Sequence, residues 1–148
     1  MKLTIKRMNQ SKESIDGFLS VNDKRLCDTA ECNRLSLPEG TYPICLVKCK
    51  QYGRRVICLG EPHCDKCGQM PTEFVFNNTL MPIRCPMLKM GNGVVGRRDG
   101  SIIVGERVGG VEKPVWGSMI HTKTAYDRVF DCVRKNLERG HDVTLRIM

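Results

Sequence analysis

Long apolar runs are absent from this chain. Residues 101–104, Ser-Ile-Ile-Val, are among the longest apolar stretches, and they are far too short to span a bilayer. Residues 1–7 alternate polar and apolar side chains, and they lack the continuous apolar stretch of a secretory signal. We therefore expect a cytoplasmic protein that does not act at a membrane.

Aromatic residues are scarce as well. They make up 5% of the sequence, which leaves few stacking platforms for single-stranded nucleic acid. The chain is nevertheless basic, with 24 Lys+Arg against 16 Asp+Glu and a net charge of +8. Such a charge favours a nucleic-acid partner or an acidic protein partner. The basic residues are spread along the chain, so a solvated basic surface is the simpler interpretation and nucleic-acid binding is the alternative.

Cysteine is plentiful in this sequence, with nine residues in 148. The number is odd and no export signal is visible, which argues against a disulfide framework. In a reducing compartment, the remaining roles are buried thiols, metal ligands or a nucleophile. Cys45 and Cys49 share one face of a predicted strand, and we interpret them as buried thiols that act as small hydrophobic side chains. Cys27, Cys32 and Cys132 are interpreted in the same way.

Alternating polar and apolar residues predict strands over most of the chain. Residues 15–27 form a predicted hairpin, residues 42–48 and 56–59 form further strands, and residues 143–147 form the last strand. No repeat or linker divides the 148 residues, a length typical of one domain. We predict a single α+β domain, residues 1–148, with a curved antiparallel β-sheet or small barrel and one C-terminal α-helix.

The helix is the clearest predicted element, over residues 124–139. Thr124 is its predicted N-cap, and Gly140 is predicted to end it in a left-handed conformation. His121 and His141 flank the helix, where we expect capping and surface roles. Five apolar residues at helical spacing should pack against the sheet: Tyr126, Val129, Phe130, Val133 and Leu137.

The sharpest local signal is a Cys-x-x-Cys turn formed by Cys64 and Cys67. Such a turn can direct two thiolates to one metal ion. Zinc then needs further ligands, for which Cys58, His63 and Cys85 are the candidates, and zinc is the one cofactor that the sequence suggests. Because one pair is half a zinc motif, three interpretations stay open: reduced thiols in a turn, a structural zinc site, or a redox pair.

Several short motifs, taken in order, resemble an uncharacterised domain family encoded in phage genomes and bacterial mobile elements. Residues 27–31 and 37–42 are similar to an early strand of that family and its Pro-x-Gly-Thr-Tyr turn. Residues 91–92 and 100–106 are similar to its central motif, and residues 124–128 to the start of its closing helix. The resemblance covers most of the chain and implies an accessory or binding protein of a phage or mobile element.

A glycine-rich loop within that central motif holds the candidate binding residues. Its glycines mark places where the backbone must turn sharply or approach something closely. The candidates are Gly91, Asn92, Arg97, Arg98 and Gly100.

The family's central motif usually reads His-x-Gly-Asn followed by Gly-Cys. This arrangement is similar to that of cell-wall L,D-transpeptidases, in which a histidine base activates a thiolate that attacks a peptide carbonyl. Here Lys89 stands in place of the histidine and Ser101 in place of the cysteine, so that chemistry is not available. A Ser/Lys dyad of these two residues is the remaining catalytic arrangement, and it requires a desolvated lysine.

We therefore expect a protein without enzymatic activity. The alternative is a degenerate or substituted cell-wall peptide transpeptidase or hydrolase that uses Lys89 and Ser101. A basic nucleic-acid-binding module is the third interpretation.

Overall fold

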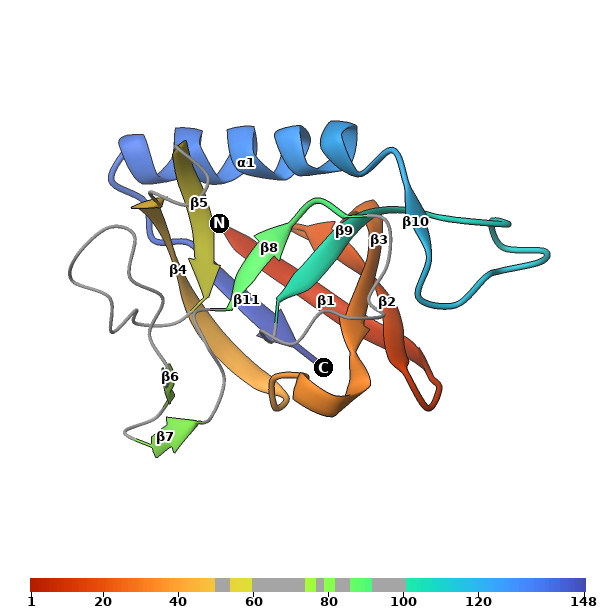
Figure 1. The fold of residues 1–148 in the computed structure, drawn as a ribbon. Coiled ribbons are helices and arrows are strands. Elements are labelled where there is room, and N and C mark those ends of the chain that lie inside the picture. The colour runs from red at the N-terminus through yellow and green to blue at the C-terminus, as the bar shows by residue number, and fades with distance from the viewer. Residues whose placement is uncertain (50–53, 60–73, 77–78, 82–85, 92–100) are drawn as a thin grey trace.

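The computed structural model describes residues 1–49, 54–59, 74–76, 79–81, 86–91 and 101–148 (Figure 1). Strands dominate, with one long helix near the C-terminus. The elements are β1 (Lys2–Gln10), β2 (Ser14–Val21), β3 (Lys24–Cys32), the 3-10 helix η1 (Asn33–Leu35), β4 (Gly40–Cys49), β5 (Arg54–Leu59), β6 (Phe74–Phe76), β7 (Thr79–Met81), β8 (Met87–Lys89), β9 (Ile102–Arg107), β10 (Met119–Ile120), α1 (Thr122–Glu138) and β11 (Thr144–Ile147).

Eight strands form a closed barrel in the order β9-β3-β2-β1-β11-β4-β5-β8, which pairing of β8 with β9 completes. β10 pairs with the end of β9, and β6 and β7 form a separate two-stranded antiparallel sheet. The prediction of an α+β domain with a small barrel and one C-terminal helix is confirmed.

Two of the barrel's neighbouring pairs are parallel, β1 with β11 and β8 with β9, which the expectation of an antiparallel sheet missed. The reason lies in part in the helix. α1 crosses one end of the barrel (Figure 1) and returns the chain to the end at which β1 begins, so β11 runs beside β1 in the same direction. The N-terminal amine of Met1 donates a hydrogen bond to the carbonyl of Asp142 at 3.0 Å, which ties the two strand starts together.

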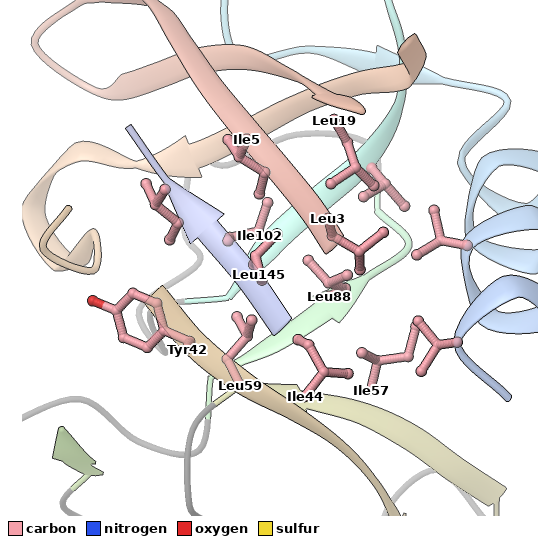
Figure 2. Close-up of a cluster of buried hydrophobic side chains, with 14 of the residues drawn as sticks. Leu3, Ile5, Leu19, Tyr42, Ile44, Ile57, Leu59, Leu88, Ile102 and Leu145 are labelled. Carbon is pink, nitrogen blue, oxygen red and sulfur yellow. The ribbon is translucent and has the colours of Figure 1, made fainter. Parts of the chain in front are cut away.

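Apolar side chains fill the interior of the barrel (Figure 2). Alternate residues of each strand point inward, as the period of two requires, and they meet side chains from the opposite strands. The residues labelled in the close-up are Leu3, Ile5, Leu19, Tyr42, Ile44, Ile57, Leu59, Leu88, Ile102 and Leu145.

The helix covers one end of this interior, contacting β9 most extensively and also β3 and β8. Tyr126, Val129 and Val133 are buried as predicted, whereas Phe130 and Leu137 are partly buried at the margin of the core. In the part of the chain that the structure describes, no helix is long and apolar enough to cross a membrane.

The ends of the helix differ in part from the prediction. It begins at Thr122 rather than after Thr124, and its N-cap is His121, which adopts a left-handed conformation with φ 53° and makes no side-chain capping bond. His121 Nδ1 instead lies 2.9 Å from a carboxylate oxygen of Glu106 on β9. At the other end, Gly140 has φ 78°, as its predicted role requires.

A buried ion pair closes the opposite end of the barrel. Arg7 donates to both carboxylate oxygens of Glu31, at 3.0 and 2.7 Å, and to the carbonyl of Leu37 at 2.6 Å. Beside it, the hydroxyl of Tyr42 donates to the carbonyl of Pro38, and burial raises the pKa of Tyr42 to about 12. Tyr42 lies on the side of the core away from the helix (Figure 2). Polar side chains therefore cover this end of the barrel interior, whereas the apolar face of α1 covers the other end.

A second buried ion pair lies on the outside of the barrel. Arg107 at the end of β9 is 6% exposed, and its Nε donates to a carboxylate oxygen of Asp16, which is 0% exposed, at 3.0 Å. Its Nη2 donates to the carbonyls of Gly17 and Thr29, and its guanidinium carbon lies 5.3 Å from the centre of the Trp116 ring. These bonds hold the end of β9, where the segment leading to β10 begins, against the outer face of β2 and β3.

Candidate functional site

Lys89 and Ser101, the residues of the hypothetical dyad, lie on adjacent strands of the barrel. Lys89 is the last residue of β8, and Ser101 immediately precedes β9. Leu88 pairs with Ile102 in parallel register, and both of these residues face the interior. By alternation, Lys89 and Ser101 share the outer face, with Ser101 two residue pairs before Lys89 along the ladder.

Both side chains are buried although they lie on the outer face. Lys89 is 8% exposed and Ser101 is 3% exposed. The hydroxyl of Ser101 accepts a hydrogen bond from the backbone N–H of Met87 at 3.2 Å, so it helps to hold β8 against β9. Burial of the lysine meets one requirement of a Ser/Lys dyad, whereas burial of the serine removes its hydroxyl from the surface.

The other predicted binding residues fall largely outside the described part of the chain. Gly91, two residues after Lys89, is described and partly buried. Asn92, Arg97, Arg98 and Gly100 lie outside the described residues. Their role in binding stays a prediction.

Most of the predicted zinc ligands also lie outside the described residues, namely His63, Cys64, Cys67 and Cys85. Cys58 is described, on β5. Among the described residues, no group of three or more His, Cys, Asp or Glu side chains could hold a metal ion. Zinc binding therefore stays a prediction.

Cys58 instead lies directly opposite Cys45 on the neighbouring strand β4. Both point outward, because their neighbours Ile44 and Ile57 point into the core. Cys58 is buried together with Val56 and Met87, whereas Cys45 is partly exposed.

The thiol of Cys45 differs from that of Cys27 in the direction of its pKa shift. A hydrogen bond with the Cys58 side chain lowers the pKa of the Cys45 thiol below its ordinary value, against burial, which raises it. Cys27 behaves in the opposite way, because burial raises the pKa of its thiol to about 12. Interpretation of Cys27 as a buried thiol is thus confirmed, whereas Cys45 is a partly exposed thiol with a paired neighbour. Sequence reasoning missed this pair because alternation predicts each strand but not the register of β4 against β5.

Four neighbouring strands of the barrel present a basic outer wall, formed by the outward residues of β1, β2, β3 and β11. Lys2, Lys6 and Arg146 are exposed on it. Arg146 lies opposite Thr4, and Lys6 lies opposite Phe18 in the strand ladders, so these side chains occupy neighbouring positions.

Each acidic side chain on these four strands forms an ion pair with an arginine. Asp28 lies 2.6 Å from Arg25, whose guanidinium carbon also lies 4.6 Å from the centre of the Phe18 ring. Asp16 and Glu31 form the two buried pairs with Arg107 and Arg7. Among the described residues, no carboxylate lies within ion-pair distance of Lys2, Lys6 or Arg146, so the basic outer wall carries uncompensated positive charge.

Comparison with known proteins gives no further guide to this wall or to the Lys89–Ser101 region. No protein-family model, no curated protein and no solved structure matches the chain. The resemblance to the phage and mobile-element family therefore stays a prediction.

Proposed function

We propose that this protein is a non-enzymatic binding protein, an accessory factor of a phage or mobile element, that holds nucleic acid by its phosphates on the basic outer wall. The observation that carries the proposal is the set of exposed cations on that wall, Lys2, Lys6 and Arg146, which no acidic side chain of the same strands neutralises. Regularly spaced phosphates are the anions that such a row of cations fits.

The remaining residues of the wall support the same partner. Thr4, Ser20 and Thr144 lie beside the cations on β1, β2 and β11. Lysine, arginine, serine and threonine are the side chains that most often contact phosphates. The wall carries one aromatic ring, Phe18, and Arg25 already covers it. We therefore infer contacts with the backbone rather than stacking with bases, and binding that depends little on sequence.

Fluorescence anisotropy with labelled single- and double-stranded oligonucleotides, over a series of salt concentrations, tests this proposal. For duplex DNA the logarithm of affinity falls with that of salt by about 0.9 per phosphate neutralised. The double variant Lys6→Gln/Arg146→Gln removes two cations from the wall, so its slope should be shallower by about two units.

A charge-matched control variant distinguishes the effect of the wall residues on affinity from the effect of the protein's net charge. Lys123→Gln/Arg128→Gln also removes one lysine and one arginine, from exposed positions on α1. It should bind like the parent protein. Equal weakening of both double variants, or no binding by the parent at low salt, would refute the proposal; binding to polyglutamate but not to oligonucleotides would identify an acidic protein partner instead.

A hydrolase that uses Lys89 and Ser101 is the second candidate function. Two observations favour it: the two residues share a face on adjacent strands, and the lysine is largely buried. Reaction with a serine-directed fluorophosphonate, read by intact mass, tests it. We expect no labelling, because Ser101 is also buried and its hydroxyl accepts from the Met87 N–H. Stoichiometric labelling at Ser101 that is lost in Lys89→Ala would overturn the non-enzymatic proposal.

A further inference from the structure

Cys45 and Cys58 face each other across the β4–β5 ladder, on strands that do not belong to the basic outer wall. Directly opposed residues of an antiparallel pair have Cα atoms about 4.5–5.5 Å apart. A disulfide requires a Cα separation of about 4.4–6.8 Å. The ladder thus places both thiols within bonding range without movement of either strand, and a hydrogen bond already joins the two side chains.

The two thiols differ in their access to solvent. Cys45 is partly exposed, whereas Cys58 is 1% exposed and packs with Val56 and Met87. Redox-sensing cysteines commonly combine an accessible thiol that reacts first with a neighbouring thiol that resolves the product. We propose that Cys45 and Cys58 form a thiol–disulfide switch, with Cys45 as the attacking thiol, Cys58 as the resolving thiol and a low-molecular-weight disulfide as the oxidant.

The reaction proceeds in two exchange steps. The Cys45 thiolate attacks one sulfur of glutathione disulfide, forms a mixed disulfide and releases one glutathione thiolate. Cys58 then loses its proton, and its sulfur attacks Cys45 Sγ and displaces the second glutathione thiolate, which takes up the proton. The two protein thiols are oxidised by two electrons, and one glutathione disulfide is reduced to two thiols.

Oxidation would lock β4 to β5 on the outer face of the barrel. Both strands belong to the closed ladder, so the bond would add a covalent link between neighbours that hydrogen bonds already join. A crosslink also restricts the unfolded chain, so the oxidised protein should melt at a higher temperature than the reduced protein. This switch does not rest on the proposed nucleic-acid binding, because the two proposals use different residues on different strands.

The test is incubation of the reduced protein with glutathione disulfide, followed by digestion and mass spectrometry. Leu46 and Leu59 immediately follow the two cysteines, so chymotrypsin cleavage separates Cys58 from Cys64 and Cys45 from Cys49. The expected product is one intramolecular disulfide between the Cys45 and Cys58 peptides. A disulfide that joins either residue to another cysteine, or no oxidation at either residue, would overturn the proposal.

Single variants separate the two roles. Cys58→Ala should stop at a stable glutathione adduct on Cys45, because the resolving thiol is gone. Cys45→Ala should give neither adduct nor disulfide at Cys58, because Cys58 is buried. Cys132→Ala, the matched control on the helix, should still form the Cys45–Cys58 bond.

Two further outcomes would count against the switch. An adduct on Cys58 in Cys45→Ala would contradict the assignment of roles. Native mass spectrometry that finds a zinc ion lost from both Cys45→Ala and Cys58→Ala, but kept by Cys132→Ala, would assign the pair to a metal site. If Cys58→Ala fails to fold, as near-ultraviolet circular dichroism would reveal, Cys58→Val replaces it with a side chain of similar character.

Discussion

Removal of Arg107 should destabilise the protein more than loss of any exposed charge. In Arg107→Met, the carboxylate of Asp16, which is 0% exposed in the parent protein, loses its cationic partner at 3.0 Å. It keeps bonds from the hydroxyl of Ser14, at 2.6 Å, and from the backbone N–H of Gly117, at 2.9 Å. The carbonyls of Gly17 and Thr29 lose the donors that Arg107 supplied.

Loss of one partner from a buried ion pair costs about 3–5 kcal/mol, chiefly because an uncompensated charge stays buried. The two remaining donors to Asp16 place our expectation near the lower end, at about 3 kcal/mol. A small domain is stable by about 5–15 kcal/mol, so the variant should fold but unfold at a clearly lower urea concentration. Urea unfolding followed by circular dichroism measures the change, and the m-value should stay constant.

A double-mutant cycle tests the reasoning more stringently. Asp16→Leu/Arg107→Met removes both charges, and it should recover much of the stability that either single change loses. Arg25→Met is the matched control, because Arg25 is 50% exposed and its ion pair with Asp28 at the surface is worth at most about 1 kcal/mol. A cost below about 1 kcal/mol for Arg107→Met, or no recovery in the double variant, would refute this account of the buried pair.

Three further outcomes are expected. Leu145→Ala should lower the free energy of unfolding by about 2–5 kcal/mol, because Leu145 is fully buried in the barrel. Phe130→Ala should cost less than the loss of a buried phenylalanine, which is about 3–5 kcal/mol, because Phe130 is only partly buried. Chemical denaturation of both variants compares the two costs. Cys27 should react slowly with iodoacetamide at pH 8, because a thiol with a pKa of about 12 is ionised in about one molecule in ten thousand at that pH. The rate of alkylation at Cys27 should rise as the pH rises toward that pKa. Rapid alkylation of Cys27 at pH 8, read by peptide mass mapping, would contradict this. Alkylation of the native protein under non-reducing conditions, read by mass spectrometry, should find most of its nine thiols free or metal-bound, and two or more stoichiometric disulfides would contradict a reducing compartment.

The sequence by itself determined the class of fold, because that depends on local periodicity. Alternation in residues 143–147 and the stripe that contains Val129 and Val133 each report which side of an element faces the core, and the structure confirms both. Gly140 likewise marks the end of the helix through its own backbone freedom. Phe130 shows the limit of this reasoning, since helical spacing defines a direction but not how far the barrel extends beneath it.

Tertiary structure alone decided which residues meet. Strand direction and register bring Lys89 beside the Ser101 strand, and Cys45 opposite Cys58, through contacts that no local pattern encodes. The same holds for Arg107, whose partner Asp16 lies 91 positions away in the chain. Alternation predicts which side chains point away from the interior. Whether such a side chain is covered, like Ser101, or exposed, like Lys6, depends on where segments distant in the sequence pack. The same difference distinguishes Cys58, which is covered on the outer face of β5, from the exposed cations of the basic outer wall.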